Sequence, residues 1–293
     1  MSDYIIRGID KTKSVRFFVA RTTDIVQEIR NIHESSAVGS AAMGRLATMA
    51  SLMGVDLKGP GDSVTLRIDG NGIGGKLIAV SDNEGNVRVH TTYPQADTAE
   101  KAPGKLDVAT FVGRSGTISI IRDYGLKEPF TGVSEIVSGE IAEDFANYYF
   151  YSEQTPSIVS LGVLVDVDLS IKAAGGLLVQ AMPGCHEEEI VKLEKAVQEL
   201  PPISKMIDEG MTPEDILNEY FGELEVEILD KKEIEYRCNC SRDRVDGALI
   251  SIGRKELTHM LEEDGEAEIV CDFCGKRYHY TKEDLERLIE ISK

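Results

Sequence analysis

The sequence predicts an α+β protein in three parts, and three observations support this prediction. Residues 1–183 alternate apolar strands with short turns, which predicts an N-terminal α+β domain with antiparallel sheets. Residues 184–232 are strongly acidic and have helical periodicity, which predicts a mostly helical linker segment. Residues 233–293 contain four of the five cysteines, which predicts a small C-terminal α+β module built around them.

A strand pair and two helices open the first part. The strands Tyr4–Ile9 and Ser14–Arg21 flank a short polar turn. Thr23 or Asp24 is suited to cap the first helix, because a short polar side chain there accepts a hydrogen bond from a free backbone N–H. The second helix runs from about Ser36 to Met53 and is rich in alanine and glycine, so it should pack tightly. Its methionines favour core packing over a surface that binds other proteins.

A meander of three strands follows, and its first turn contains a glycine-rich motif. The strands are expected at Val64–Asp69, Lys76–Ser81 and Asn86–Thr92. The turn Gly70–Lys76 matches two phosphate-binding patterns, G-x-G-x-x-G and G-x-x-x-x-G-K. Both patterns require a helix next, whose N-terminus holds the phosphates, whereas Leu77 begins a strand. A glycine-rich hairpin is therefore favoured over a nucleotide site.

The first part ends with a strand, an aromatic helix and two very apolar strands. The strands are expected at Thr117–Asp123, Ser157–Leu169 and Gly176–Ala181, and the helix at Glu143–Gln154. Five aromatic side chains cover more than one stripe of this helix, so some of them could face a partner. Core filling is the favoured role for these aromatic residues.

The acidic segment is expected to rest on a neighbouring part of the chain. Residues 186–233 carry 15 acidic and 5 basic side chains. Glu187–Leu200 is an amphipathic helix, and Thr212 followed by Pro213 predicts the start of another. Glu223–Tyr236 has strand-like alternation and leads into the cysteines. The segment is too apolar on its inner faces for a floppy linker, and too charged and short to be stable alone.

Two cysteine-containing turns organise the last part. Cys238 and Cys240 form a C-x-C turn, and Cys271 and Cys274 form a C-x-x-C turn that is followed by the permissive backbone of Gly275. Four thiolates at this spacing predict one Zn²⁺ in a closed tetrahedral site. A closed site leaves no open position for water, so metal-assisted hydrolysis is not expected.

Helices and strands are expected around these turns. They are the helices Arg242–Ile252 and Lys255–Glu262, a strand on each side of the second turn, and a last helix capped by Thr281. Five basic residues lie near the cysteines in sequence, and they could either offset the charge of a four-thiolate centre or be ordinary surface charges. They are Arg237, Arg242, Arg244, Lys276 and Arg277.

The spacing of the cysteines leaves two roles open for the metal. One is purely structural, in which the metal only folds a small module. The other is a switch, because zinc contributes about 10–16 kcal/mol to the folding of such modules and oxidation of the thiolates removes that contribution. The cysteines within each turn are close enough to pair, but disulfides that close such tiny loops hold little structure in place. Oxidation should therefore unfold this end of the chain.

Charge and hydropathy argue against several classes of protein. The net charge is −19, and residues 234–293 carry 14 acidic and 10 basic side chains, a poor match for a phosphate backbone. A zinc-ribbon nucleic-acid-binding protein is therefore the alternative interpretation and not the favoured one. The chain has no uncharged apolar stretch of membrane-spanning length and no signal-like run near its start. A cytoplasmic protein without a membrane span is expected.

Enzymatic chemistry finds little support in the sequence. A thiol-disulfide oxidoreductase that uses Cys271 and Cys274 would need a βαβ context, which is missing here. Cys185 lies beside His186 but has no local nucleophile signature. It is expected to be an ordinary cysteine at a domain edge, and no enzyme activity is predicted.

Several motifs resemble one known family across essentially the whole chain. In the last part they are Cys-x-Cys-Ser-Arg-x-Arg-Val at 238–245, Glu-Leu-x-x-Met-Leu at 256–261 and Cys-x-Phe-Cys-x-x-x-Tyr at 271–278. In the first part they are Ser-Glu-Gln-x-Pro at 152–156 and Ala-Gly-Gly-x-x-x-Gln-x-x-Pro-Gly at 174–184. These motifs resemble the heat shock protein 33 family, the 33 kDa chaperonin. Asp243 stands where a glutamate is expected in that family.

The resemblance implies a cytoplasmic, ATP-independent chaperone of the holdase type that is inactive while reduced and zinc-bound. One Zn²⁺ would be held by Cys238, Cys240, Cys271 and Cys274. Oxidation during unfolding stress would pair Cys238 with Cys240 and Cys271 with Cys274, with loss of zinc. The linker would then lose its support, and the protein would form a homodimer and bind unfolding client proteins.

The resemblance also implies a division of roles along the chain. Residues 1–183 would form the chaperone and dimerisation domain, residues 184–232 the linker, and residues 233–293 the redox-switch domain. Neither nucleic acid nor a membrane is expected as a partner.

Overall fold

The computed structural model describes residues 2–102 and 104–292 and confirms the α+β class. The chain divides into two compact units, Met1–Arg237 and Cys238–Lys293. The acidic segment, residues 184–232, lies within the first unit, where its apolar side chains pack on a sheet.

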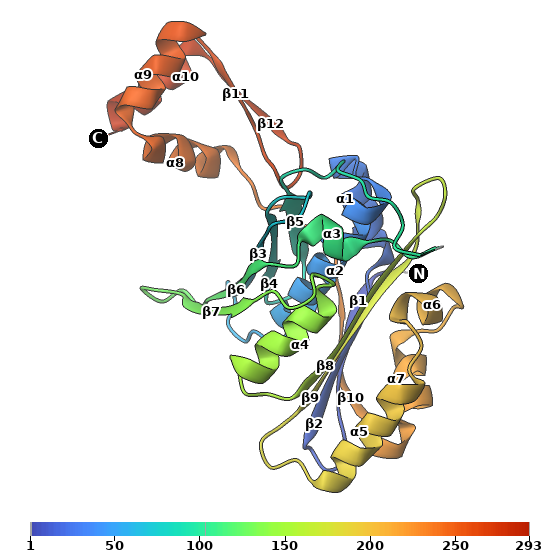
Figure 1. Ribbon diagram of the computed structural model, residues 1–293. Helices are drawn as coiled ribbons and strands as arrows, with labels where there is room; N and C mark the ends of the chain where they lie inside the picture. The colour runs from blue at the N-terminus through green and yellow to red at the C-terminus, as the bar shows by residue number, and fades with distance from the viewer. Residues whose placement is uncertain (1, 103, 293) are drawn as a thin grey trace. The chain divides into compact units, whose positions relative to one another are not determined.

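Two five-stranded antiparallel sheets form the frame of the first unit (Figure 1). The first sheet has the order β10-β1-β2-β9-β8, and these strands are Glu227–Glu233, Tyr4–Ile9, Val15–Arg21, Ile171–Ala181 and Ser157–Val165. The second sheet has the order β5-β4-β3-β6-β7, and these strands are Val87–Thr91, Leu77–Asp82, Ser63–Gly70, Gly116–Asp123 and Phe130–Glu135.

The helices of this unit pack against the sheets on more than one face. They are α1 (Thr23–His33), α2 (Ala37–Gly54), α3 (Val108–Val112), α4 (Ala142–Tyr151), α5 (Glu187–Glu199), α6 (Ile203–Asp208) and α7 (Pro213–Phe221), followed by the 3-10 turn Gly222–Leu224.

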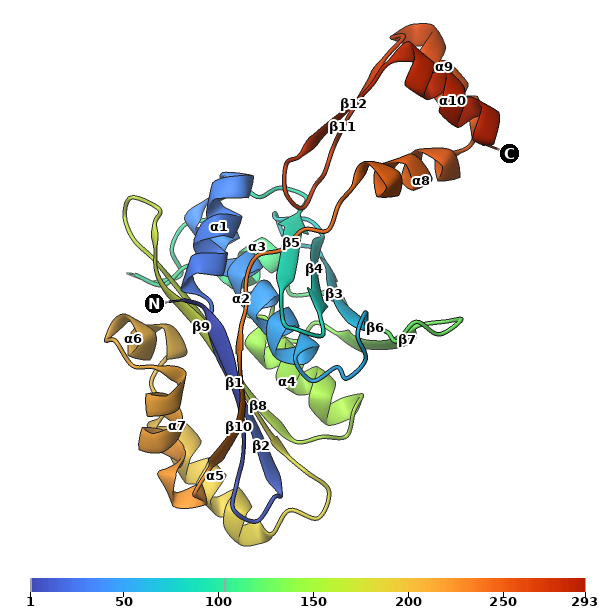
Figure 2. The ribbon, with the colours of Figure 1, turned by 180° about the vertical axis from the view of Figure 1, so that it is seen from behind.

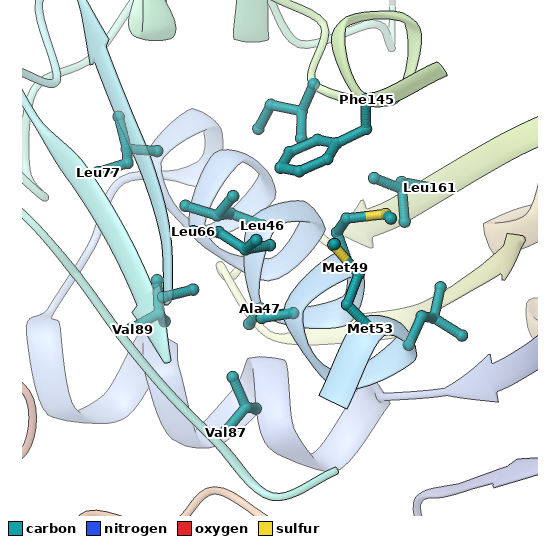
Figure 3. Close-up of a cluster of buried hydrophobic side chains, with 14 of the residues drawn as sticks. Leu46, Ala47, Met49, Met53, Leu66, Leu77, Val87, Val89, Phe145 and Leu161 are labelled. Atoms are coloured by element: carbon teal, nitrogen blue, oxygen red, sulfur yellow. The ribbon is translucent and has the colours of Figure 1, made fainter. Parts of the chain in front are cut away.

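Helix α2 lies between the two sheets and forms the centre of the main core. All of its residues are buried except Ala37 and Arg45, because its small residues let the surrounding backbones approach closely. Figure 3 shows Met49 and Met53 of this helix among side chains from both sheets and from α4. The prediction that these methionines fill the core is confirmed.

Helices α5, α6 and α7 cover the other face of the first sheet (Figures 1 and 2). Successive strand residues point to opposite faces, so Phe18 enters the main core and Phe17 enters the second core beneath these helices. The ring of Phe17 contacts Phe221 edge to face, with 5.3 Å between the centroids. The predicted cap of α7 is confirmed, since Thr212 Oγ1 accepts a hydrogen bond from the Asp215 N–H at 3.1 Å.

The glycine-rich turn is a hairpin between β3 and β4, as predicted. Its amide groups are used by the chain itself. The Gly72 N–H donates to the Val112 carbonyl at 3.2 Å, and the Gly74 N–H donates to the Phe111 carbonyl at 2.9 Å. Because these donors are occupied and a strand follows, the turn lacks the phosphate-binding geometry of the nucleotide motifs.

The start of α1 differs from its prediction, because Thr22 occupies the N-cap position and makes no side-chain cap bond. The hydroxyl of Thr23 is engaged elsewhere, as it accepts a hydrogen bond from the Ala174 N–H of β9 at 3.1 Å. A distant carboxylate serves this helix end: Asp3 accepts the Ile25 N–H at 2.7 Å. Sequence reasoning looked for a local cap and missed this long-range one.

Other corrections concern element boundaries and omitted elements. Strand β8 ends at Val165, and β9 begins at Ile171, because the chain turns sharply through Leu169, whose φ is 68°. Elements β7, α3 and α6 were not predicted from the sequence. Helix α4 has both buried and exposed aromatic side chains. Phe145, Tyr148 and Tyr149 are buried, whereas Phe150 and Tyr151 are exposed.

The second unit contains three helices and a two-stranded sheet in its described residues. They are α8 (Arg242–Ile252), α9 (Arg254–Glu263), β11 (Ala267–Val270), β12 (Arg277–Tyr280) and α10 (Lys282–Ile291). The predicted cap of α10 is confirmed, because Thr281 and Asp284 form a capping box. Across residues 2–102 and 104–292, none of the helices combines the length and apolar content needed to cross a bilayer.

Candidate metal centre

The second unit brings the four predicted cysteines to one point. Their sulfur atoms all lie within 4.8 Å of one another, and each cysteine is half-buried. The Sγ atoms of Cys238 and Cys271 are 3.8 Å apart, and those of Cys240 and Cys274 are 3.4 Å apart. Residues more than 30 positions apart in the sequence therefore meet, as the spacing predicted.

The second turn is a compact knuckle between β11 and β12. The Cys271 N–H donates to the Lys276 carbonyl at 3.0 Å, and the Gly275 N–H donates back to the Cys271 carbonyl at 2.8 Å. Gly275 has a φ of 69°, in the left-handed region that other residues rarely adopt. This glycine lets the chain reverse quickly enough to aim both sulfurs of the turn the same way.

The first turn is held by the start of α8. Ser241 caps this helix by accepting a hydrogen bond from the Arg244 N–H at 3.3 Å. One residue further, the Arg242 guanidinium lies over the Tyr280 ring and donates to Asp284 at 2.8 Å. These contacts fix the start of α8 against β12 and α10, so the C-x-C turn is positioned from its C-terminal side.

The donor set fits a single Zn²⁺ ion. Zinc binds thiolates at about 2.3 Å, so the sulfurs of a tetrahedral centre lie about 3.8 Å apart. The two measured separations, 3.8 and 3.4 Å, are close to that value. His279 stays outside this cluster, because its Nε2 lies 3.1 Å from Glu268. Four sulfur donors without an oxygen donor favour zinc over magnesium or calcium.

Neighbouring groups shift the pKa values of the thiols in different directions. The Tyr278 hydroxyl donates a hydrogen bond to Cys240 Sγ at 3.1 Å. Burial works against the thiolate of Cys240, but this hydrogen bond and those from the other thiols lower its pKa to about 7. Burial raises the pKa of Cys238 and, together with the neighbouring sulfurs, that of Cys274. The thiolate, which is the form that binds metals and reacts with oxidants, is thus favoured more at Cys240 than at Cys238 or Cys274.

The nearby basic residues mostly serve as surface charges. Arg237 lies 2.6 Å from Glu235, Arg242 pairs with Asp284, and Arg277 pairs with Glu268. Each of these guanidinium groups is therefore compensated by a carboxylate. The Lys276 ammonium lies over the ring of Tyr278, 5.2 Å from its centroid.

The core of the second unit is small. Its buried apolar side chains are Leu249, Leu257, Tyr278, Tyr280, Leu285 and Leu288. A unit of this size rarely supplies enough buried surface to be stable without a metal, a disulfide or a partner. A metal bound at the four sulfurs would therefore be a major part of its stability.

The fifth cysteine occupies an ordinary position in the first unit. Cys185 is half-buried against the core beneath α5, α6 and α7, and its Sγ lies 3.7 Å from the His186 carbonyl oxygen. Sequence reasoning did not assign a role to the Tyr278 hydroxyl. The only available signal was its place four residues after Cys274, which does not reveal the direction of a hydroxyl group.

Comparison with known proteins gives a consistent result over the whole chain. The sequence model of the Hsp33 protein family matches residues 3–281. A protein named 33 kDa chaperonin from Alkaliphilus metalliredigens is 45% identical over 290 residues, covering 99% of both chains. One with the same name from Staphylococcus aureus is 46% identical over 288 residues, covering 98% of both.

A solved structure agrees with these sequence matches. The crystal structure of the 33 kDa chaperonin (heat shock protein 33 homolog) from Thermotoga maritima superposes with a TM-score of 0.90. Its sequence is 37% identical, and the match covers 99% of each chain. The fold described above is thus shared with that protein.

Proposed function

The chain belongs to the Hsp33 family, and from this premise we propose that it is a redox-regulated, ATP-independent holdase. In the reduced state it is inactive. After oxidation it binds unfolding proteins and prevents their aggregation. The single observation that carries the proposal is the convergence of four cysteines at one point of a unit with a very small core.

In the reduced state, the second unit holds one Zn²⁺ through Cys238, Cys240, Cys271 and Cys274. The bound ion would supply a closed four-thiolate cross-link between the two turns. Tyr278 supports the ligand set through its hydrogen bond to Cys240, and β11 and β12 position the second turn. Residues 233–293 act in this proposal as the redox-switch domain.

Oxidation converts the four thiolates into two disulfides, Cys238–Cys240 and Cys271–Cys274. For each disulfide, two thiolate sulfurs give up two electrons as the S–S bond forms. Hydrogen peroxide takes up these electrons together with two protons from the solvent, its O–O bond breaks, and two water molecules result. The sulfur contacts at 3.8 and 3.4 Å join the two turns across the centre, so the pairing within each turn rests on the family resemblance.

Loss of the four thiolates removes the cross-link, and the second unit then lacks a sufficient core of its own. The linker, residues 184–232, loses its support in turn. Residues 1–183 then act as the chaperone and dimerisation domain, and the protein forms a homodimer. The protein acts in the cytoplasm, without a membrane or nucleic-acid partner and without enzyme activity.

Light scattering by a thermally unfolding protein tests this proposal directly. Protein treated with peroxide should suppress the scattering, and reduced protein should not. Cys185→Ser is the matched control, because it removes a thiol outside the cluster and should switch normally. Equal protection by reduced and oxidised protein would contradict the switch.

The nucleic-acid interpretation is disfavoured by the ion pairs of the second unit. Arg242 and Arg277, which would otherwise be available to phosphates, are each paired with a carboxylate. A filter-binding titration with salt separates the two functions, because tight and strongly salt-dependent binding of RNA or DNA would favour a zinc ribbon.

A further inference from the structure

The last residues of the first unit form a strap that closes one edge of each sheet. We use this name for Glu227–Arg237, which comprises β10 and the four residues after it. The first half pairs with β1, and the second half runs beside β5, where the Arg237 N–H donates to the Val87 carbonyl at 2.9 Å. Figures 1 and 2 both show β10 at the margin of its sheet, next to β1.

Side chains contribute little to the hold of β10 on β1. Its apolar residues Ile228 and Leu229 remain 43% and 58% exposed. The pairing is interrupted by a register shift opposite Arg7 and Gly8. What remains is the backbone ladder, partly exposed ion pairs, which contribute little to stability, and the Lys231 ammonium over the Tyr4 ring, 3.8 Å from its centroid. The ion pairs are Arg7–Asp230, Lys231–Glu214 and Lys232–Glu84. The attachment is therefore largely independent of sequence.

One buried apolar side chain anchors the strap in the main core, and the partly buried Tyr236 packs against the same core. Ile234 is only 6% exposed and packs beside Gly85, where a Cβ atom would lie 2.9 Å from its Cγ2. Next to it, the Tyr236 hydroxyl donates to the Val89 carbonyl at 3.3 Å. This anchor lies four residues before Cys238 in the sequence, so unfolding of the second unit frees the chain directly adjacent to it.

Release of the strap by itself would expose the backbone edge of β1, in addition to any apolar face that detachment of α5, α6 and α7 uncovers. The side chains of β1 are already buried on both sides, Ile5 in the main core and Ile6 beneath α5, α6 and α7. The newly free features would be the backbone edge of β1 and the slot vacated by Ile234. An edge strand with free N–H and C=O groups pairs readily with another extended chain.

We propose that oxidised protein binds an extended segment of an unfolding client as a replacement for the strap, paired with β1 and with an apolar side chain in the slot of Ile234. This inference rests on the proposed holdase function and names one binding site for it. The occupant is an extended client segment because the strap that sits there shows what the site accepts: backbone pairing with one apolar anchor. An extended segment of almost any sequence meets these requirements.

Synthetic peptides of residues 227–237 test the proposal on the oxidised full-length protein. The Ile234 N–H donates to the Asp3 carbonyl, just before β1, at 3.1 Å. In an antiparallel pair every second N–H points at the partner strand, so the Lys232 N–H also points at β1, whereas those of Lys231 and Glu233 point away from it. One peptide is unmodified, a second is N-methylated at Lys232 and Ile234, and a third is N-methylated at Lys231 and Glu233. The third is the matched control, because its methyl groups point away from β1.

The readout is displacement of fluorescent, reduced and carboxymethylated α-lactalbumin, a permanently unfolded polypeptide. The unmodified peptide and the control should displace it at concentrations at least tenfold below those required for the peptide methylated at Lys232 and Ile234. Equal potency of all three peptides, or displacement by none while client binding persists, would overturn the inference and leave the holdase function intact. A peptide that turns dimers into monomers without displacing the client would assign the edge to a second copy and also overturn it. Failure of oxidised protein to bind α-lactalbumin at all would count against the holdase function itself.

Discussion

The hydroxyl of Tyr278 donates a hydrogen bond to Cys240 Sγ, 3.1 Å away, from the strand that follows the other cysteine turn. Tyr278 is only 6% exposed and belongs to the small core of the second unit. One residue therefore connects the core to the cysteine cluster. Tyr278 orients the sulfur of Cys240, which belongs to the first turn. Tyr278 itself lies on β12, the strand that follows the second turn.

Tyr278→Phe should weaken metal binding with little effect on the fold, because it removes the hydroxyl and keeps the buried ring. Groups that hydrogen-bond to metal ligands typically contribute about 10- to 100-fold in affinity. Competition with a chromophoric zinc chelator measures this loss. Tyr280→Phe is the matched control, since the hydroxyl of Tyr280 donates to Asp246 at 2.7 Å and not to a sulfur. A similar loss of affinity in both variants would contradict the assigned role of Tyr278.

Removal of the metal should unfold the second unit while the first unit keeps its main core. The second unit has few buried side chains, whereas the first has a core built from two sheets and α2. Treatment of reduced protein with a chelator should release zinc and decrease helical circular dichroism in one coupled step. Cys271→Ser should do the same without a chelator and make residues 184–237 sensitive to trypsin. Unchanged trypsin patterns in this variant would show that the two parts are not coupled.

Asp3 should make stability depend on pH. Burial raises the pKa of its carboxyl group to about 6, although the N–H groups of Ile25 and Asp24 and the charge of Arg21 partly oppose this. The unfolded value is about 3.9, so the native state binds the proton more tightly. The free energy of unfolding should therefore fall as the pH rises from about 4 to 6 and be independent of this group above that range.

Asp3→Asn tests this pH dependence, because the amide cannot ionise and still offers an oxygen to the Ile25 N–H. Urea unfolding at pH 4.5 and at pH 7.5 should show a smaller decrease in stability for the variant than for the natural protein. The expected difference is on the order of 1–2 kcal/mol. The same pH dependence in both proteins would show that Asp3 is ionised throughout this range.

Local patterns in the sequence predicted much of the fold and the cysteine cluster. The C-x-C and C-x-x-C spacings carry the geometry of each turn, and Thr212 and Thr281 mark helix starts by chemistry that acts over three residues. What could not be predicted depends on distant partners. The cap of α1 comes from Asp3, which is distant in sequence. Strand β7 lies at the edge of its sheet and pairs only with β6, so its sequence shows little alternation between apolar and polar residues. The Tyr278 hydroxyl belongs to the same class, since its direction follows from packing.

The strap illustrates this distinction most clearly. The alternation of Glu223–Tyr236 predicted a strand, but nothing local indicates that it joins β1, more than 200 residues earlier in the chain. Nor does the sequence distinguish Ile234, which is buried in the main core, from Ile228, which is exposed in the same strap. This difference between two isoleucines leads to a final prediction.

Ile234→Ala should release the strap in reduced, zinc-bound protein and permit client binding without oxidation. Truncation of a buried isoleucine costs about 2–5 kcal/mol, and here the loss falls on a segment otherwise held by backbone pairing and partly exposed ion pairs. Hydrogen exchange should increase in β10 and in β1, and reduced protein should suppress light scattering by a thermally unfolding client.

Two variants separate strap release from general destabilisation. Ile228→Ala truncates an isoleucine of the same strap that is 43% exposed, and it should leave reduced protein inactive. Ile68→Ala truncates a fully buried side chain of β3 in the same main core, away from the strap, and it should lower global stability without activating reduced protein. If Ile68→Ala activated the reduced protein as strongly as Ile234→Ala, loosening of the core would suffice for activity. The strap would then have no specific role in keeping the reduced form inactive.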